Sequence, residues 1–267
     1  MNRTMCGYLK LSSAFSVGLA LMLTVGGVII KQPLSVVAQS IPERWQAEEY
    51  QPPGNLGSPT SVDQGGTRGS RITSQNYINQ PIALVPTTSN HFGVTVNPHP
   101  HFLVYLPGSS NSQDTQQVEF RLEDGETGEE IYTSTFKRSA PAGIVTIALP
   151  AEAGLLPLEV NKVYHWSLAI ADDLQENKAE AEGWIKRVTL QDSLSRQLQQ
   201  ASPQEQARLY AEAEIWYDSV AKLAQVYRSA PNDLALASDW EKLLKAAGLE
   251  QLVQVSLVRS SLTSAQR

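Results

Sequence analysis

The clearest structural signal in the chain is Val118-Glu119-Phe120-Arg121-Leu122-Glu123, which is followed directly by Asp124-Gly125. Apolar and charged residues alternate here, so an extended strand has one apolar face and one charged face. Asp124-Gly125, and Thr127-Gly128 shortly after it, are typical of a hairpin turn with positive φ angles. The segment therefore predicts an antiparallel strand with one buried face, followed by a hairpin.

Short β-type runs occur on both sides of this strand, across residues 81–190. Turn residues separate the runs, which begin roughly 8–15 residues apart, and no pattern of helical length interrupts them. Such spacing is typical of an antiparallel β-sandwich of the immunoglobulin or fibronectin type and argues against a parallel α/β sheet. The eight expected strands are residues 82–85, 92–96, 101–106, 117–123, 130–136, 144–149, 163–171 and 184–190.

The apolar pattern becomes helical after Leu190. Ser202-Pro203-Gln204-Glu205 is a strong start signal, because Ser is a preferred N-cap, Pro fits the first helical position and Glu completes a capping box. We expect Asp233 to cap a later helix, which Gly248 ends. Residues 191–258 therefore predict three to four helices packed on the sandwich, with residues 252–258 as a strand or a packed extension. The expected fold class is α+β, with a frayed tail over residues 259–267.

The first 38 residues have the order of a secretory signal peptide. Basic Arg3 and Lys10 precede an apolar run over residues 17–30, and Val36-Val37-Ala38 supplies the residues for cleavage after Ala38. The alternative is an uncleaved membrane anchor, because residues 11–30 are long enough to span a bilayer. We expect export to the periplasm or the extracellular space, with membrane contact only through the signal segment if it stays attached.

Cleavage after Ala38 changes both the charge and the cysteine content. Removing Arg3, Lys10 and Lys31 takes the formal net charge from -6 to -9, and the single Cys, Cys6, is removed as well. A negative charge of this size argues against a nucleic-acid partner, which requires a basic surface. A mature chain without Cys has no disulfides, so its own core must hold the fold together.

A polar segment follows the signal peptide. Of the 42 residues in 39–80, 26 are Gln, Asn, Ser, Thr, Gly or Pro. Such a segment has too little apolar surface to offset the entropy cost of ordering it, so it predicts a disordered tether. We expect the rings of Trp45 and Tyr50 to be loosely attached, and docking on the body of the protein or on a partner is the alternative.

Seven blocks of residues are similar to a cyanobacterial family known as domain of unknown function 928. The resemblance covers about residues 65–258, and it implies an exported protein of unassigned function with no established catalytic residues to carry over. The blocks are Ile82-Ala83-Leu84-Val85-Pro86, Phe102-Leu103-Val104-Tyr105-Leu106-Pro107, Val118-Glu119-Phe120, Gly143-Ile144-Val145, Tyr164-His165-Trp166, Gly183-Trp184-Ile185 and Ile215-Trp216-Tyr217-Asp218.

A second, local resemblance concerns one helix pair. Tyr210, a turn at Glu214, Trp216, Ser219 and Pro231 have spacings similar to those of one tetratricopeptide unit. Glu214 is where that repeat prefers Gly, and Ser219 is where it prefers Ala. A single unit cannot form a solenoid, so the resemblance implies that the helix pair packs on the sandwich.

The candidate metal ligands are three histidines, His91, His99 and His101. Two imidazoles at a strand entrance, with His91 approaching across a hairpin, would provide three nitrogen ligands for zinc or copper in a metal-dependent enzyme. Exposed loop histidines without a metal are the favoured interpretation, and we expect no cofactor. The sequence also lacks a nucleophile motif, and acidic neighbours such as Glu129-Glu130 point to opposite faces of a strand.

The remaining candidates are aromatic. Trp216 is expected in the core, while Tyr217 and Asp218 are candidate surface residues for binding a partner. Trp184, Tyr105 and Tyr132 support the alternative of a carbohydrate-binding sandwich, which requires exposed rings on one sheet. The preferred hypothesis is an exported, non-enzymatic binding or assembly module whose partner is an envelope or extracellular protein or a glycan.

Overall fold

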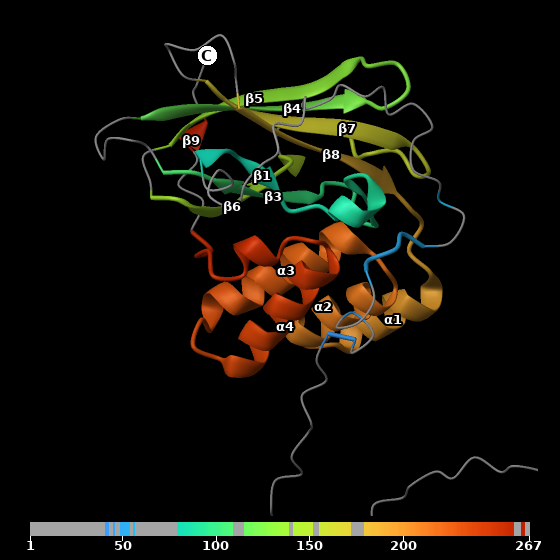
Figure 1. Ribbon diagram of the computed structural model, residues 1–267. Helices are drawn as coiled ribbons and strands as arrows, with labels where there is room; N and C mark the ends of the chain where they lie inside the picture. The colour runs from blue at the N-terminus through green and yellow to red at the C-terminus, as the bar shows by residue number, and fades with distance from the viewer. Residues whose placement is uncertain are drawn as a thin grey trace, which may run out of the picture. The chain divides into compact units, whose positions relative to one another are not determined.

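The computed structural model describes residues 41–42, 45, 49–53, 56, 79–108, 115–138, 141–151, 155–171, 179–258 and 263–264 (Figure 1). These residues belong to one unit, Gln39–Arg267. The predicted signal peptide and its cleavage site at Ala38 lie outside the described residues. Within the described part of the chain, no helix combines the length and the apolar character needed to cross a bilayer.

Strands β1 to β8 of two β-sheets precede the helices, and β9 follows them, so the fold is α+β. The smaller sheet has the order β1-β3-β6, and the larger sheet has the order β2-β8-β7-β4-β5-β9. Every pair of strands is antiparallel except β2 and β8, which are parallel. The strands are β1 (Ile82–Ala83), β2 (Phe92–Thr95), β3 (His101–Leu106), β4 (Gln116–Asp124), β5 (Glu130–Arg138), β6 (Gly143–Ala148), β7 (Val163–Ala171), β8 (Ala179–Arg187) and β9 (Thr263–Ser264).

The predicted alternation on β4 is confirmed. Val118, Phe120 and Leu122 are fully buried, and they face the smaller sheet. The ring of Phe102 on β3 lies 5.1 Å from the rings of both Phe120 and Trp166, measured between centroids. The apolar faces of the two sheets therefore share one core.

The hairpin after β4 forms as expected, although only one of its two glycines has a positive φ angle. The carboxylate Oδ1 of Asp124 accepts hydrogen bonds from the amides of Glu126 and Thr127, at 2.8 and 2.9 Å. Gly128 has a φ of 71°, whereas Gly125 lies outside the left-handed region. The side chain of Asp124 thus holds the turn that the sequence predicts.

The sequence places the start of β8 about five residues too late. β8 begins at Ala179, whereas the pattern predicts a strand from Trp184. Its early residues Glu180 and Glu182 are charged, and the alternate positions carry only Ala181 and Gly183. Because no large apolar residue marks the inner face there, the alternation is not visible in the sequence.

Four helices follow the sheets, and their predicted ends are confirmed. Ser202 Oγ accepts a hydrogen bond from Glu205 N at 3.2 Å, and Asp233 Oδ1 accepts one from Ala235 N at 2.8 Å. Gly248 has a φ of 69° and follows Ala247, the residue after the end of the last helix, so it takes the left-handed conformation that is typical of a helix C-terminus. The helices are α1 (Asp192–Gln200), α2 (Pro203–Glu212), α3 (Trp216–Ser229) and α4 (Leu234–Ala246).

Only half of the predicted capping box is formed at α2. The carboxylate of Glu205 binds Arg208 instead of the backbone at Ser202, with Arg208 Nε 3.1 Å from Glu205 Oε2. A guanidinium is the stronger partner because its hydrogen bonds to a carboxylate are charge-assisted. Glu214 then ends the α2 turn with a φ of 59°, at the position where the tetratricopeptide pattern prefers Gly.

The chain after α4 is a packed extension that joins the edge of the smaller sheet. Ile144 N donates to Ser256 O at 2.9 Å, and Val258 N donates to Ile144 O at 3.0 Å. This parallel bridge pairs the outer edge of β6, so the C-terminal extension satisfies backbone groups that an edge strand leaves open.

Trp45 and Tyr50 are buried, so the expectation that their rings are loosely attached is wrong. Tyr50 is 0% exposed and Trp45 4% exposed. Trp45 stacks on Trp216 of α3 at 6.2 Å between centroids. Tyr50 N donates to Ala246 O at 2.8 Å, and the Tyr50 hydroxyl donates to Glu214 O at 2.9 Å. This part of the polar segment is therefore packed on the helices, and residues 57–78 lie outside the described residues.

We predict that Trp45→Ala lowers the free energy of unfolding by about 3 kcal/mol, because it removes a buried ring from the contact with Trp216. Chemical denaturation of the purified protein measures the change. Leu234→Ala is the matched control, because Leu234 is 85% exposed and its loss is expected to change stability by less than about 0.5 kcal/mol. Equal stabilities for the two variants would contradict the packing of Trp45.

Candidate functional site

Three consecutive residues at the first turn of α3 join the helices to the sheets. The Trp216 indole donates to Leu84 O at 2.9 Å, after β1. The Tyr217 hydroxyl donates to Trp184 O on β8 at 3.1 Å and accepts a hydrogen bond from the Trp166 indole on β7 at 2.8 Å. The third residue, Asp218, accepts a hydrogen bond from Thr95 at the end of β2. We call Trp216-Tyr217-Asp218 the α3 joint.

The structure separates the three residues of this joint into two roles. Trp216 is 0% exposed, as the sequence predicts for a core residue. Tyr217 is 2% exposed, so its expected role as a surface residue is wrong. Its ring lies 5.7 Å from Phe102, and burial raises the pKa of its hydroxyl, so it stays protonated and able to donate. Tyr217 and Asp218 both line a pocket beside this joint.

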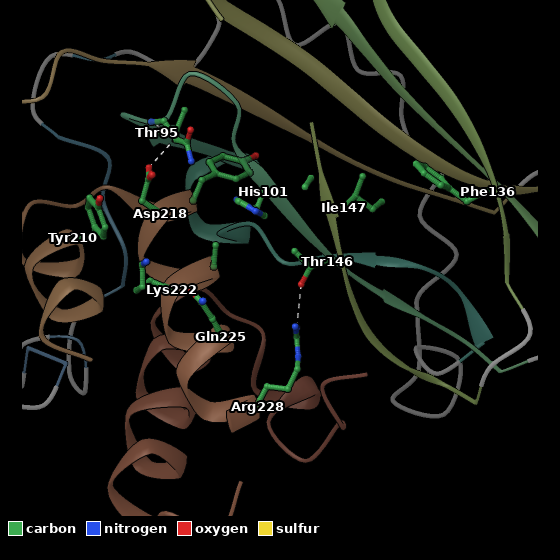
Figure 2. A pocket seen from close by; sticks show the side chains of 14 residues that line it. Thr95, His101, Phe136, Thr146, Ile147, Tyr210, Asp218, Lys222, Gln225 and Arg228 are labelled. Carbon is green, nitrogen blue, oxygen red and sulfur yellow. Dashed lines mark hydrogen bonds between the residues drawn. The ribbon is translucent and has the colours of Figure 1, made fainter. Parts of the chain in front are cut away.

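This pocket lies between α3 and strands β2, β3 and β6, with a volume of about 680 Å³ (Figure 2). We call it the α3 pocket. Asp218, Lys222 and Gln225 follow one another at helical spacing along one face of α3, and Tyr210 is contributed by α2. The polar and charged lining residues are Thr95, Asn97, His101, Thr146, Tyr210, Tyr217, Asp218, Lys222, Gln225 and Arg228.

Asp218 is anchored to the end of β2. Its Oδ2 accepts a hydrogen bond from the Thr95 hydroxyl at 2.7 Å and another from Val96 N at 3.0 Å. Removal from bulk water raises the pKa of Asp218 from 3.8 to about 6, although these two donors and the nearby Lys222 oppose the shift. The carboxylate is therefore charged at neutral pH and becomes protonated in mild acid.

Lys222 supplies a cationic group one helical turn after Asp218 on α3. It forms no salt bridge with any residue in the described part of the chain, and its charge acts on Asp218 from a distance. Burial, followed by the charge of Lys222, lowers the pKa of His101. His101 is therefore neutral at pH 7 and adds no charge to the pocket.

Arg228 lies at the other end of the row on α3. Its Nη2 donates to the hydroxyl of Thr146 on β6 at 3.1 Å (Figure 2). This hydrogen bond places the guanidinium in the wall of the α3 pocket, opposite the end that holds Asp218. Charged groups from one helix therefore line the length of the pocket.

The three histidines considered as candidate metal ligands are not brought together. His91 precedes β2 and its carbonyl accepts from Trp184 N at 2.8 Å, whereas His99 and His101 follow the far end of that strand. A ring nitrogen of His99 lies 3.1 Å from Leu155 O, away from the α3 pocket. Among the described residues, no three His, Cys, Asp or Glu side chains are grouped to hold a metal ion. The extended strand β2 separates His91 from His99 and His101, so the alternative of a three-histidine metal site is not supported.

The three rings proposed for carbohydrate binding do not share an exposed face. Tyr105 is 3% exposed in the smaller sheet. Tyr132 pairs with Leu122 and its ring lies 6.4 Å from Phe120, on the core side. Trp184 is partly buried, and its ring lies 4.7 Å from His165, its partner on β7. Alternation along paired strands therefore sends these rings to different faces, and Tyr105 is not an exposed ring.

Lys222, Gln225 and Arg228 were not among the candidate residues expected from the sequence. These residues continue the helical spacing from Asp218, which was visible in the sequence. A polar row on a helix is normally its solvent-exposed face, so the spacing alone did not distinguish a pocket from an ordinary surface. Only the packing of α3 against β3 and β6 places this row in a cavity.

A comparison with protein families supports the resemblance found in the sequence. The family model described as Domain of Unknown Function (DUF928) matches residues 63–257. The chain belongs to this family. The matched residues include β1 to β8, all four helices and the whole lining of the α3 pocket. The family description assigns no function, and no curated protein matches the chain.

We predict that Asp218→Asn makes the protein more stable than the wild type at pH 7 by about 3 kcal/mol. The raised pKa of Asp218 means that the protonated carboxyl favours the folded state. This contribution is complete below about pH 4 and is lost as the pH rises through about 6. Asn stays neutral and keeps an oxygen for Thr95 and Val96, so the two proteins are expected to converge in stability near pH 4.

Chemical denaturation between pH 4 and pH 8 measures this convergence. Thr95→Val is the companion variant, because it removes one hydrogen bond that stabilises the charged carboxylate. It is expected to move the pH dependence to higher pH. Parallel profiles for the wild type and Asp218→Asn over the whole range would contradict the prediction.

Proposed function

We propose that the protein is an exported, non-enzymatic binding module of the cell envelope and that the α3 pocket is its binding site. The observation that carries the proposal is the cavity itself. Its volume of about 680 Å³ lies in the range of small-molecule sites, and polar groups from several helices and strands converge in it.

The contacts of the pocket favour binding over catalysis. Thr95 and Asp218 form a hydroxyl-carboxylate pair in the pocket. In some enzymes the hydroxyl of such a pair is the nucleophile and the carboxylate is its base. The Thr95 hydroxyl, however, also accepts a hydrogen bond from Asn97 N at 3.0 Å, and Thr95 is 0% exposed. Because this hydroxyl is enclosed by the fold, it supports the loop after β2 and is not presented to a substrate.

The expected destination and partners follow from the sequence. The order of basic, apolar and small residues before Ala38 supports export to the periplasm or the extracellular space, with an uncleaved membrane anchor as the alternative. The net charge of -6 supports a partner other than nucleic acid. We propose an envelope or extracellular protein, or a glycan, as the source of the group that enters the pocket.

We also propose that the two sheets form a sandwich of the immunoglobulin or fibronectin type. A constant-type immunoglobulin sandwich places strands A, B, E and D in one sheet and strands C, F and G in the other. The orders β1-β3-β6 and β8-β7-β4 correspond to A-B-E and G-F-C once β2 is counted as the second half of strand A. β5 is then an added strand beside C, and the described strands include no counterpart of D. The contacts of Phe102 with Phe120 and Trp166 support the face-to-face packing.

Export makes a direct prediction about the mature protein. Protein recovered from cells that express the full chain is expected to begin at Gln39, because cleavage follows Ala38. Intact-mass analysis of the envelope and soluble exported fractions measures this. A full-length chain found only in the membrane fraction would support the uncleaved anchor instead.

We predict that Ala221→Trp abolishes ligand retention by filling the α3 pocket, which Ala221 lines. The probe is the small-molecule fraction of a cell-envelope extract, equilibrated with the purified protein and analysed by native mass spectrometry. Retained mass is expected to fall at least tenfold. Leu234→Trp places the same ring on an exposed position of α4 and is expected to retain ligand normally. Equal retention by a folded Ala221→Trp protein would rule out the pocket as the binding site.

A further inference from the structure

The charge of the α3 pocket is opposite to that of the chain. Lys222 and Arg228 contribute two cations to its lining, and Asp218 is its one carboxylate among the described residues. The whole chain carries a formal net charge of -6. A cavity with an excess positive charge concentrates the field between its low-dielectric walls and attracts anions.

The charged groups of α3 occupy one side of the pocket in a fixed order. Asp218 stands at the start of α3, Lys222 follows one helical turn later, and Arg228 follows about 9 Å further along the axis. The Arg228 guanidinium is held against β6 by Thr146 (Figure 2). The pocket therefore has an acceptor at one end and two cationic donors beyond it.

The uncharged lining residues suit a ring-shaped, hydroxylated molecule. Burial, with a smaller effect of the Asp218 charge, raises the pKa of Tyr210 to about 12, so its hydroxyl remains a donor at neutral pH. His101 presents a neutral imidazole from β3. Gln225 adds an amide that both donates and accepts. Together these side chains offer flat surfaces and hydrogen bonds without a further charge.

We propose that the α3 pocket binds a small hydroxylated molecule with one oxyanion group, of the class of sugar acids and sugar phosphates. Its oxyanion contacts Lys222 and Arg228, and one of its hydroxyls donates to Asp218. This inference rests on the proposed function of the pocket and adds the chemical class of the ligand.

A neutral ligand fits the pocket less well for a physical reason. It would remove water from the Lys222 ammonium without supplying a counter-charge, and an unpaired buried charge is costly. An oxyanion supplies the missing acceptor, and charge-assisted hydrogen bonds of this kind are stronger than neutral ones. Asp218 already accepts two hydrogen bonds at Oδ2, so the ligand hydroxyl approaches its other oxygen.

Isothermal titration at pH 7.5 and low salt tests the proposal with three probes: glucuronate, glucose 6-phosphate and glucose. At least one anionic probe is expected to bind at least tenfold more tightly than glucose. Lys222→Gln is expected to lower that affinity at least tenfold and to remove the discrimination, and added salt is expected to weaken binding. Lys245→Gln is the matched control, because Lys245 is 57% exposed on α4 and paired with Glu241.

The probes also identify the oxyanion. Binding of glucuronate alone indicates a carboxylate ligand, and binding of glucose 6-phosphate alone indicates a phosphate. Equal affinities for glucose and both anions, or an unchanged affinity in Lys222→Gln, would overturn the inference. If no anionic probe binds while Ala221→Trp still loses retained extract components, the ligand class is wrong and the pocket remains the binding site. If Ala221→Trp retains them, the proposed function fails as well.

Discussion

The hydrogen bonds of the α3 joint are the constraint on which the rest of the structure depends. Trp216, Tyr217 and Asp218 are consecutive, yet their side chains bind the chain after β1, strands β7 and β8, and the end of β2. Each of these contacts satisfies a polar group that the packing of helix on sheet removes from water. An unmade hydrogen bond at such a position is costly, so the contacts define how α3 meets the sheets.

The N-terminal segment extends this joint. Trp45 stacks on Trp216, and Tyr50 packs against the same ring at 5.2 Å. Ile41 N, four residues before Trp45, donates to the buried carboxylate of Asp239 on α4 at 3.1 Å. The helices are thus covered on one side by the sheets and on another by the N-terminal segment. This segment is mostly polar, but its apolar residues Ile41, Trp45 and Tyr50 are buried.

The α3 pocket follows from the same arrangement. Because the first turn of α3 is held to β2, β7 and β8, the row formed by Lys222, Gln225 and Arg228 faces strands β3 and β6. Asp218 belongs to both features, since it anchors the helix and lines the cavity. Its protonation therefore links the stability of the fold to the charge of the proposed site.

Local rules in the sequence were sufficient for most of the elements. Alternation on β4, the Asp124 turn, and the caps at Ser202, Asp233 and Gly248 depend on neighbours within a few residues, so composition and spacing determine them. The start of β8 was missed because its inner face there carries only Ala181 and Gly183. The sequence also determined the family, since the blocks that carry the resemblance lie within the matched residues.

Tertiary structure alone decided where the side chains of these elements go. The helical spacing around Tyr217 would be the same in a surface helix and in a buried one. Only the packing of α3 on the sheets brings its hydroxyl to Trp166 and Trp184. Likewise His91 and His101 are close in the sequence, but an extended β2 keeps them at opposite ends of a strand. The physical reason is that burial and site geometry depend on contacts between distant segments, which local periodicity does not encode.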